Sequence, residues 1–199
     1  ALMLEVHFYS PFNFCQMEKD EIWGYQAFYW GEGNYVNGSN YNSTWGDESL
    51  VQSEMRQMKN KYSSKGYPVV LGEFGSLWRD IPQGENQDVH NASIRLWYKT
   101  VCKYAIRNGI IPFVWDTNFC GHPSGTIVDR KNLRIFNQFA YDGMMEGCKS
   151  ERWPSFTTDI TAPAIMSTDD KMYDLNGRQL TSEPTKGLYI RNGKKVWVK

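Results

Sequence analysis

Glu73 is a single carboxylate at the end of an apolar run, VVLGEFG, that spans residues 69–75. A carboxylate in such a run is costly to bury unless it is paired. Two explanations are open: Glu73 caps the next turn or pairs with a basic group such as Arg79, or it acts as a nucleophile or acid–base group. The neighbouring glycines, Gly72 and Gly75, let the backbone approach a ligand closely, which favours the chemical role.

Two other apolar segments end in side chains that suit the same chemistry. The first offers His7 and Tyr9, which alternate onto one face, and the second offers Trp115, followed by Asp116 and Asn118. Taken alone, the imidazole is better explained as a hydrogen-bonded core histidine, and the indole equally well as core packing. Because active sites of parallel α/β folds lie where strands end, their joint placement favours a common site. Aromatic planes beside a carboxylate suit a sugar ring.

The elements that must position these residues alternate along the chain. Apolar runs predict buried strands at residues 2–9, 69–74 and 110–115. Apolar residues at helical spacing predict helices at residues 48–64 and 131–148. A further helix is predicted after a polar loop at 76–88; its apolar face runs from Ile94 to Ala105, and it stops at Asn108-Gly109. The last helix is expected to place Leu133, Phe136, Ala140 and Met144 on its inner side. This order predicts parallel strands with covered faces, hence an α/β sheet or barrel.

Composition excludes several classes of partner. Basic and acidic residues both number 22, so no net charge attracts nucleic acid or a membrane surface. No apolar run is long enough for membrane insertion. The four cysteines are too widely spaced for a zinc site, and their disulfide state is open. No metal or cofactor is expected, and the aromatic content of 15% suits an uncharged carbohydrate.

Four motifs together resemble glycoside hydrolase family 5. They are HFYSPFNF at 7–14, LGEFG at 71–75, VWDTN at 114–118 and TIVDRKN at 126–132. They look like the last three strand ends and the final helix start of the endoglucanases of rumen and gut Bacteroidetes, of the Prevotella type. The resemblance covers residues 1–149 and implies the C-terminal part, about strands 6 to 8, of a (β/α)8 TIM barrel. It further implies retaining hydrolysis of β-1,4-glucans by double displacement.

The resemblance also implies roles for individual residues. Glu73 corresponds to the catalytic nucleophile, His7 and Tyr9 line the subsite where the bond is cleaved, and Trp115 is the platform under that sugar. Hydrogen bonds from a phenol or an imidazole would keep the carboxylate ionised, as a nucleophile requires. Asn118 is a weaker candidate for binding sugar hydroxyls, together with Asn13 and His122.

Long loops add candidate aromatic platforms. Residues 10–47 show no sustained helical or strand period, and a loop of this length is expected to be functional. We expect outer glucosyl subsites at Trp23, Trp30, Trp45 and Trp78. The alternative for each is that the indole anchors its loop.

The second carboxyl group of a retaining mechanism is not evident. In the family it is the glutamate of an Asn-Glu motif at the fourth strand end, and no Asn-Glu dipeptide occurs in this sequence. Glu5 lies one layer deeper than His7, and the acids of the long loop are poor substitutes. We therefore expect a fragment that is inactive alone and that exposes two open sheet edges and half a barrel core. Its partner would be strands 1 to 5 of the barrel, as another chain or through self-association.

The sequence changes character after residue 149. Residues 150–164 form a Pro/Ser/Thr-rich linker, and residues 165–199 contain short strand patterns separated by turn signals. This β tail is similar to the ends of Bacteroidetes C-terminal sorting domains, which implies a secreted or cell-surface protein. A small flap packed on the barrel is the alternative.

Other functions fit part of this pattern. A non-catalytic carbohydrate-binding module would also be neutral and aromatic-rich, although most such modules are β-sandwiches. A family 5 mannanase, xyloglucanase or lichenase would share the site residues. The expected ligand is a β-glucan polysaccharide or a cello-oligosaccharide.

Overall fold

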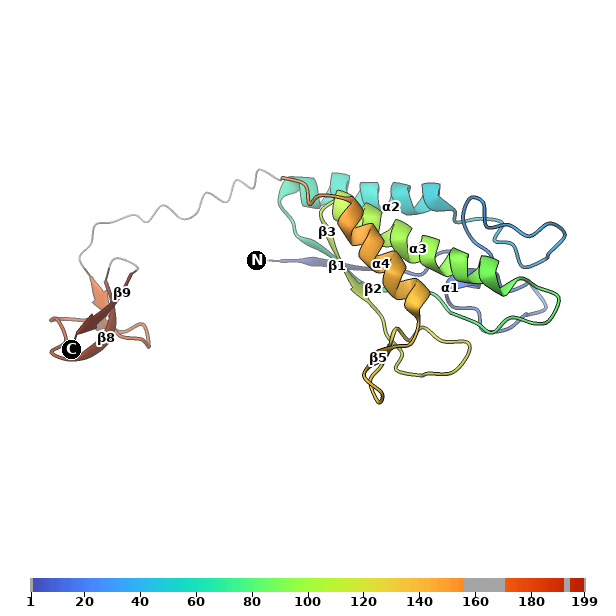
Figure 1. Ribbon diagram of the computed structural model, residues 1–199. Helices are drawn as coiled ribbons and strands as arrows, with labels where there is room; N and C mark the ends of the chain where they lie inside the picture. Colours follow the sequence, from blue (N-terminus) through green and yellow to red (C-terminus); the bar gives the residue numbers. More distant parts are fainter. Residues whose placement is uncertain (1, 156–170, 192–193, 199) are drawn as a thin grey trace. The chain divides into compact units, whose positions relative to one another are not determined.

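The structure is a computed structural model that describes residues 2–155, 171–191 and 194–198. The chain divides into two compact units, residues 1–157 and 158–199 (Figure 1). Most of the expected linker at 150–164, and the first residues of the expected tail, lie outside the described residues. The three expected segments, 1–149, 150–164 and 165–199, stay a prediction.

A parallel three-stranded sheet forms the centre of the first unit. Its strands are β1 (Leu4–Phe8), β2 (Val69–Phe74) and β3 (Ile110–Val114), in that order. Both neighbouring pairs are parallel, so all three strands end at one edge. The predicted strands are confirmed, and the residues that follow them are brought together at that edge.

Helices connect these strands as the apolar periodicity predicts. The long helices are α2 (Glu48–Lys61), α3 (Gln87–Arg107) and α4 (Gln138–Ser150). The short ones are α1 (Phe12–Cys15) and the 3₁₀ turn η1 (Ser63–Lys65). Side chains of Asp47, Asn86 and Asn137 accept hydrogen bonds from the first-turn N–H groups of the three long helices. Asn108 caps the C-terminal end of α3, and the next residue, Gly109, adopts a φ of 68°.

The helix predicted to start at residue 131 is wrong over its first turns. Residues 128–135 instead form a hairpin of β4 (Val128–Asp129) and β5 (Arg134–Ile135). Leu133, expected on an inner helix face, is 89% exposed with a φ of 52°. Hydrogen bonds from the side chains of Asn132 and Arg134 to Asp129 stabilise the hairpin. Residues 128–135 form a hairpin and not a helical turn because the hairpin gives the carboxylate of the buried residue Asp129 its hydrogen-bond partners.

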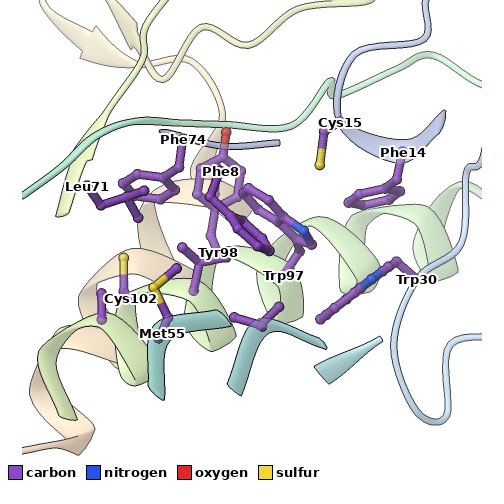
Figure 2. Close-up of a cluster of buried hydrophobic side chains, with 14 of the residues drawn as sticks. Phe8, Phe14, Cys15, Trp30, Met55, Leu71, Phe74, Trp97, Tyr98 and Cys102 are labelled. Atoms are coloured by element: carbon purple, nitrogen blue, oxygen red, sulfur yellow. The ribbon is translucent and has the colours of Figure 1, made fainter. Parts of the chain in front are cut away.

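The core lies between the sheet and α3. Trp97 and Tyr98 of this helix are fully buried, and the Trp97 ring lies 6.2 Å from the rings of both Phe8 and Phe74 (Figure 2). α3 also packs closely against α4, because a Cβ at Gly143 or Gly147 would overlap backbone carbonyls of α3.

The opposite face of the sheet is not covered. Ile111 and Phe113 of β3 are 45% and 54% exposed, whereas Ile110 on the helix-covered side is fully buried. In the sheet register Glu5 is level with Val70, and Val70 with Ile111, so these residues share the open face. The general expectation of strands covered on both faces is therefore wrong for the described residues. The exposed half of a barrel core, expected of a fragment, is what these strands show.

The second unit is a small antiparallel sheet. Its strands are β6 (Met172–Tyr173), β7 (Gln179–Leu180), β8 (Gly187–Arg191) and β9 (Lys194–Val198), in the order β7-β6-β8-β9. The turn between β6 and β7 has Asp174 accepting the N–H groups of Asn176 and Arg178. The expected β tail is confirmed as a sheet. The second Asn-Gly turn signal, at 192–193, lies outside the described residues.

Candidate active site

Glu73 is hydrogen-bonded by a residue from the neighbouring strand end. The Tyr9 hydroxyl donates to Oε2 of Glu73 at 3.0 Å, and Nδ1 of His7 lies 3.4 Å from the same oxygen. Both contacts follow from the parallel pairing of β1 and β2, which places His7 opposite Glu73. Burial, together with the hydrogen bond to Glu73, raises the pKa of Tyr9, so the phenol stays protonated and remains a donor.

A second carboxylate contacts the other side of the His7 ring. Oε1 of Glu5 lies 3.3 Å from Nε2 of His7. A neutral imidazole has a single N–H, so the ring donates to Glu5 and Glu73 together only when it is protonated. Gly72 makes room for this arrangement, because a Cβ at that position would overlap the Glu5 carboxylate. Three side chains are thus joined in the order Glu5, His7, Glu73.

A pocket of about 360 Å³ opens beside these groups. Glu73 and Tyr9 line it on one side, and Trp115, which is 53% exposed, lines it on another. The Trp115 backbone N–H donates to the carbonyl oxygen of Phe74 at 2.9 Å, which ties the platform to the strand that bears Glu73. The carboxylate, phenol, imidazole and indole expected from the sequence therefore lie together at the strand ends.

Asp116 and Asn118 hold the loop that follows β3. Asp116 accepts the backbone N–H groups of Ile127 and Val128 and the side chain of Arg130. Burial by itself raises the pKa of Asp116, but these hydrogen bonds lower it below its usual value. Asn118 also accepts from Arg130, at 3.1 Å. Asn118 was predicted to bind sugar hydroxyls; its side chain is exposed and its oxygen is engaged with Arg130.

Arg79 does not pair with Glu73. Its buried guanidinium donates to the carbonyl oxygens of Phe14, Leu77 and Met17. Burial lowers the pKa of Arg79 to about 10, so it remains charged. Arg79 therefore anchors the loop after β1, and the expectation that Glu73 pairs with Arg79 is wrong.

The four loop tryptophans fall into two groups. Trp30 is fully buried and donates its indole N–H to the carbonyl oxygen of Gly46 at 2.7 Å. The expectation that Trp30 stacks on a sugar is therefore wrong, because no ring face is accessible. Trp78 packs against Phe136 and donates to Asn91, as an anchor of its loop does. Trp78 is not among the residues that line the Glu73 pocket, and its role as a sugar platform stays a prediction.

Trp23 and Trp45 are exposed by 67% and 51% and line a separate pocket together with Asn13. His122 packs on Trp78 and faces Asp80, with 3.6 Å between Nε2 and Oδ1. Trp45 and Asn13 therefore lie at a pocket, as a sugar-binding role requires. His122 instead contacts the loop after β2 that carries Trp78 and Asp80.

Several residues of the Glu73 pocket were not predicted from the sequence. They are Cys15, Gln16, Glu18, Ser76, Leu77, Thr117 and Gly125. Ser76 and Thr117 directly follow residues that were predicted, so counting one or two positions past each strand end would have found them. The others depend on how the loops fold back. All four cysteines are free thiols.

The described residues contain no helix long and apolar enough to cross a membrane, and no cluster of acidic, histidine or cysteine side chains suited to a metal ion.

Comparison with known proteins identifies the family of this chain. Residues 1–121 match the family described as cellulase, glycosyl hydrolase family 5. The chain belongs to glycoside hydrolase family 5. The sheet and helices of the first unit correspond to part of the TIM barrel of family 5 structures.

Three family 5 relatives are similar to this chain. Endoglucanase A of Paenibacillus barcinonensis is 32% identical over 149 residues, covering 73% of this chain and 34% of the relative. A xyloglucan-specific β-1,4-glucanase from a ruminal metagenomic library, solved with the oligosaccharide XXLG, is 36% identical. Its TM-score is 0.70, and the match covers 76% of this chain and 39% of that one.

The third relative is a Bacteroides ovatus family 5 xyloglucanase, solved with an XXXG heptasaccharide. It is 26% identical with a TM-score of 0.64, covering 74% of this chain and 29% of that chain. This chain therefore spans about a third of the length of the family 5 relatives it matches.

Proposed function

We propose that this chain carries the nucleophile of a retaining endo-β-1,4-glucanase, and that Glu73 is that nucleophile. The observation that carries the proposal is the Tyr9 hydroxyl bonded to Glu73 at 3.0 Å, beside a pocket with an exposed indole. The hydrogen bond from the phenol fixes Oε2 of Glu73 and leaves Oε1 free to attack. Trp115 offers a stacking surface for the sugar at the cleaved bond.

The reaction would proceed in two displacements. Glu73 attacks the anomeric carbon and forms a glycosyl ester, while an acid protonates the departing oxygen of the glucan. Water then hydrolyses the ester as the same acid, now a base, accepts its proton. His7 and Tyr9 contact the same oxygen of Glu73, Oε2. Together they would hold the carboxylate in the orientation that attack requires.

The acid–base group would come from the part of the barrel outside these 199 residues. The mechanism needs a carboxyl group about 5 to 5.5 Å from the nucleophile. Glu5 contacts the far nitrogen of His7, and Glu18 is an exposed loop residue at the pocket. We assign the acid–base role to neither of these two carboxylates. We propose that strands 1 to 5 of the barrel supply it, in another chain or by association of copies.

The substrate class is a neutral β-glucan. Two of the relatives above were solved with xyloglucan oligosaccharides, and one is named an endoglucanase. We propose xyloglucan or unbranched β-1,4-glucan as the substrate. By its sorting-domain-like tail, we propose that the protein acts outside the cell or on its surface.

Complementation tests the proposed nucleophile. The chain is mixed with a family 5 segment that supplies strands 1 to 5, and the release of oligosaccharides from xyloglucan and carboxymethylcellulose is measured. We expect release by the mixture, none by either part alone, and a loss of at least about a thousandfold with Glu73→Gln, because no nucleophile remains.

Glu54→Gln is the matched control, since Glu54 lies on α2, and we expect full activity. Turnover by the pure 199-residue chain would contradict the need for an external acid. Binding without turnover in the complete mixture would favour the alternative of a non-catalytic carbohydrate-binding protein. Preference for mannan would contradict the proposed substrate class.

A further inference from the structure

Two cysteines of the first unit meet where α3 packs against α4. Cys102 is a buried residue of α3, and Cys148 is an exposed residue of α4. A Cβ added at Gly147 would lie 2.9 Å from the Cys102 Cβ, so Cys102 packs directly on the α4 backbone, next to Cys148. The two side chains hydrogen-bond to each other, and Cys102 is the donor. Two free thiols from different helices are therefore neighbours.

Ion pairs on both sides of the two thiols hold α3 and α4 in this register. Before them in the chain, Arg95 and Lys99 of α3 both contact Glu146 of α4, with 3.2 Å between the Lys99 Nζ and the carboxylate. After them, Nη2 of Arg107 lies 2.8 Å from Oε1 of Glu151. A disulfide requires Cα atoms within about 7 Å of each other, so it needs two backbones that approach closely and stay in register. The contact between α3 and α4 provides both.

The surroundings give the two thiols different reactivity. The hydrogen bond from Cys102 lowers the pKa of Cys148 to about 7, although burial opposes this shift. The same hydrogen bond, together with burial, raises the pKa of Cys102 well above its usual value. In thiol–disulfide exchange the thiolate is the nucleophile, and it must be accessible to the reagent. Cys148 therefore suits the attacking thiol, and Cys102 suits the thiol that completes the exchange.

We infer that Cys102 and Cys148 are a redox-active pair, which a low-molecular-weight disulfide such as oxidised glutathione converts into a disulfide bond between α3 and α4. The Cys148 thiolate attacks one sulfur of the oxidant, the oxidant's S–S bond breaks, and one glutathione leaves. The Cys102 sulfur then attacks the Cys148 sulfur, and its proton passes to the second departing glutathione. Two protein thiols are oxidised, and one small disulfide is reduced to two thiols.

The bond would enclose the part of the chain that leads to the Trp115 platform. β3, Trp115 and the β4–β5 hairpin all lie between the two cysteines in the sequence. Neither Cys102 nor Cys148 is among the residues that line the Glu73 pocket, so the pair is separate from the proposed catalysis. A disulfide stabilises a fold mainly by restricting the unfolded chain. We expect the oxidised chain to have a Tm about 5 to 10 °C above that of the reduced chain.

Peptide mapping tests the pair. The full chain is treated with oxidised glutathione at neutral pH, its remaining thiols are alkylated in denaturant, and its peptides are analysed by mass spectrometry without reduction. We expect Cys102 and Cys148 in one cross-linked peptide pair, and exposed Cys120 as a glutathione adduct. Cys102→Ala should leave Cys148 as a stable glutathione adduct, because no second thiol completes the exchange. Cys148→Ser should leave buried Cys102 as a free thiol and abolish the Tm difference.

Cys120→Ser is the matched control, because Cys120 is also an exposed thiol, and this variant should keep both the cross-link and the Tm difference. Oxidation in denaturing urea should give several pairings, since only the folded helices select Cys102 for Cys148. A glutathione adduct on Cys148 beside a free Cys102 in the folded parent would overturn the pair. A cross-link mainly between Cys148 and Cys120 would overturn it as well. An oxidised chain with an unchanged Tm would overturn the stabilising effect of the bond.

Discussion

At the scale of single residues, the site depends on contacts between side chains that the sequence keeps far apart. Tyr9 and Glu73 are 64 positions apart, yet their oxygens lie 3.0 Å from each other. A hydrogen bond to a charged group contributes more than one between neutral groups, about 1.5 to 3 kcal/mol. The geometry around Glu73 is therefore sensitive to the loss of a single hydroxyl.

Replacing Tyr9 by phenylalanine tests that sensitivity. In the complemented enzyme we expect Tyr9→Phe to lower kcat by about 10- to 100-fold, because Glu73 loses its hydrogen-bond donor and its fixed orientation. The measurement is the rate of oligosaccharide release at saturating substrate. Tyr67→Phe, at an exposed tyrosine between η1 and β2, should keep the full rate. A rate of Tyr9→Phe within twofold of the parent would remove Tyr9 from the proposed mechanism.

At the scale of elements, α3 holds the loops that follow two of the strands. Trp97 donates to the carbonyl oxygen of Ser10 after β1, and the Tyr98 hydroxyl accepts from the N–H of Ser76 after β2. Nε2 of His90 accepts the backbone N–H of Arg79, while its Nδ1 lies 2.7 Å from the carbonyl oxygen of Phe28. One helix thus positions the segments on either side of Glu73.

His90 makes this anchoring dependent on pH. Burial lowers the pKa of His90 from 6.5 to about 4. The hydrogen bond to the Phe28 carbonyl oxygen opposes this shift, and the nearby charges of Arg79 and His122 add to it. The unfolded state binds more protons between these two pH values, so folding stability is complete above pH 6.5 and falls as the pH drops towards 4. We expect a loss of about 3 kcal/mol of unfolding free energy across this window, measured by urea denaturation.

A glutamine at position 90 supplies a donor and an acceptor without titrating. We expect His90→Gln to flatten the dependence between pH 6.5 and 4, while His122→Gln keeps it. An unchanged slope in His90→Gln would assign the pH dependence to other groups.

At the scale of the whole molecule, the open face of the sheet is the feature that most needs a partner. Met3, Ile111 and Phe113 are exposed by 62%, 45% and 54%, although they lie in or directly beside strands β1 and β3 of the parallel sheet. Parallel sheets are normally covered on both faces, and exposed apolar patches mark interaction surfaces. Strands 1 to 5 of the barrel are the partner that we propose for this face.

Dye binding measures whether this face is covered. We expect the isolated chain to bind an apolar fluorescent dye such as ANS and to self-associate, and we expect addition of the complementary barrel segment to suppress both. Phe113→Lys should reduce dye binding and association in the isolated chain. Leu133→Lys, at an equally apolar exposed site on the β4–β5 turn, should have little effect. A monomeric chain that binds no dye would contradict the need for a partner.

Much of this protein follows from the sequence alone. Apolar runs predicted the three strands, and apolar residues at helical spacing predicted α2 and α3. Each of these elements buries side chains that belong to its apolar pattern. Strand-end positions identified Glu73, His7, Tyr9 and Trp115.

The tertiary structure decided what those patterns could not. Residues 128–135 formed a hairpin because Asp129 found polar partners there. Trp30 became an anchor and Trp45 an exposed platform, although both are loop tryptophans, because burial depends on how a loop folds back over the core.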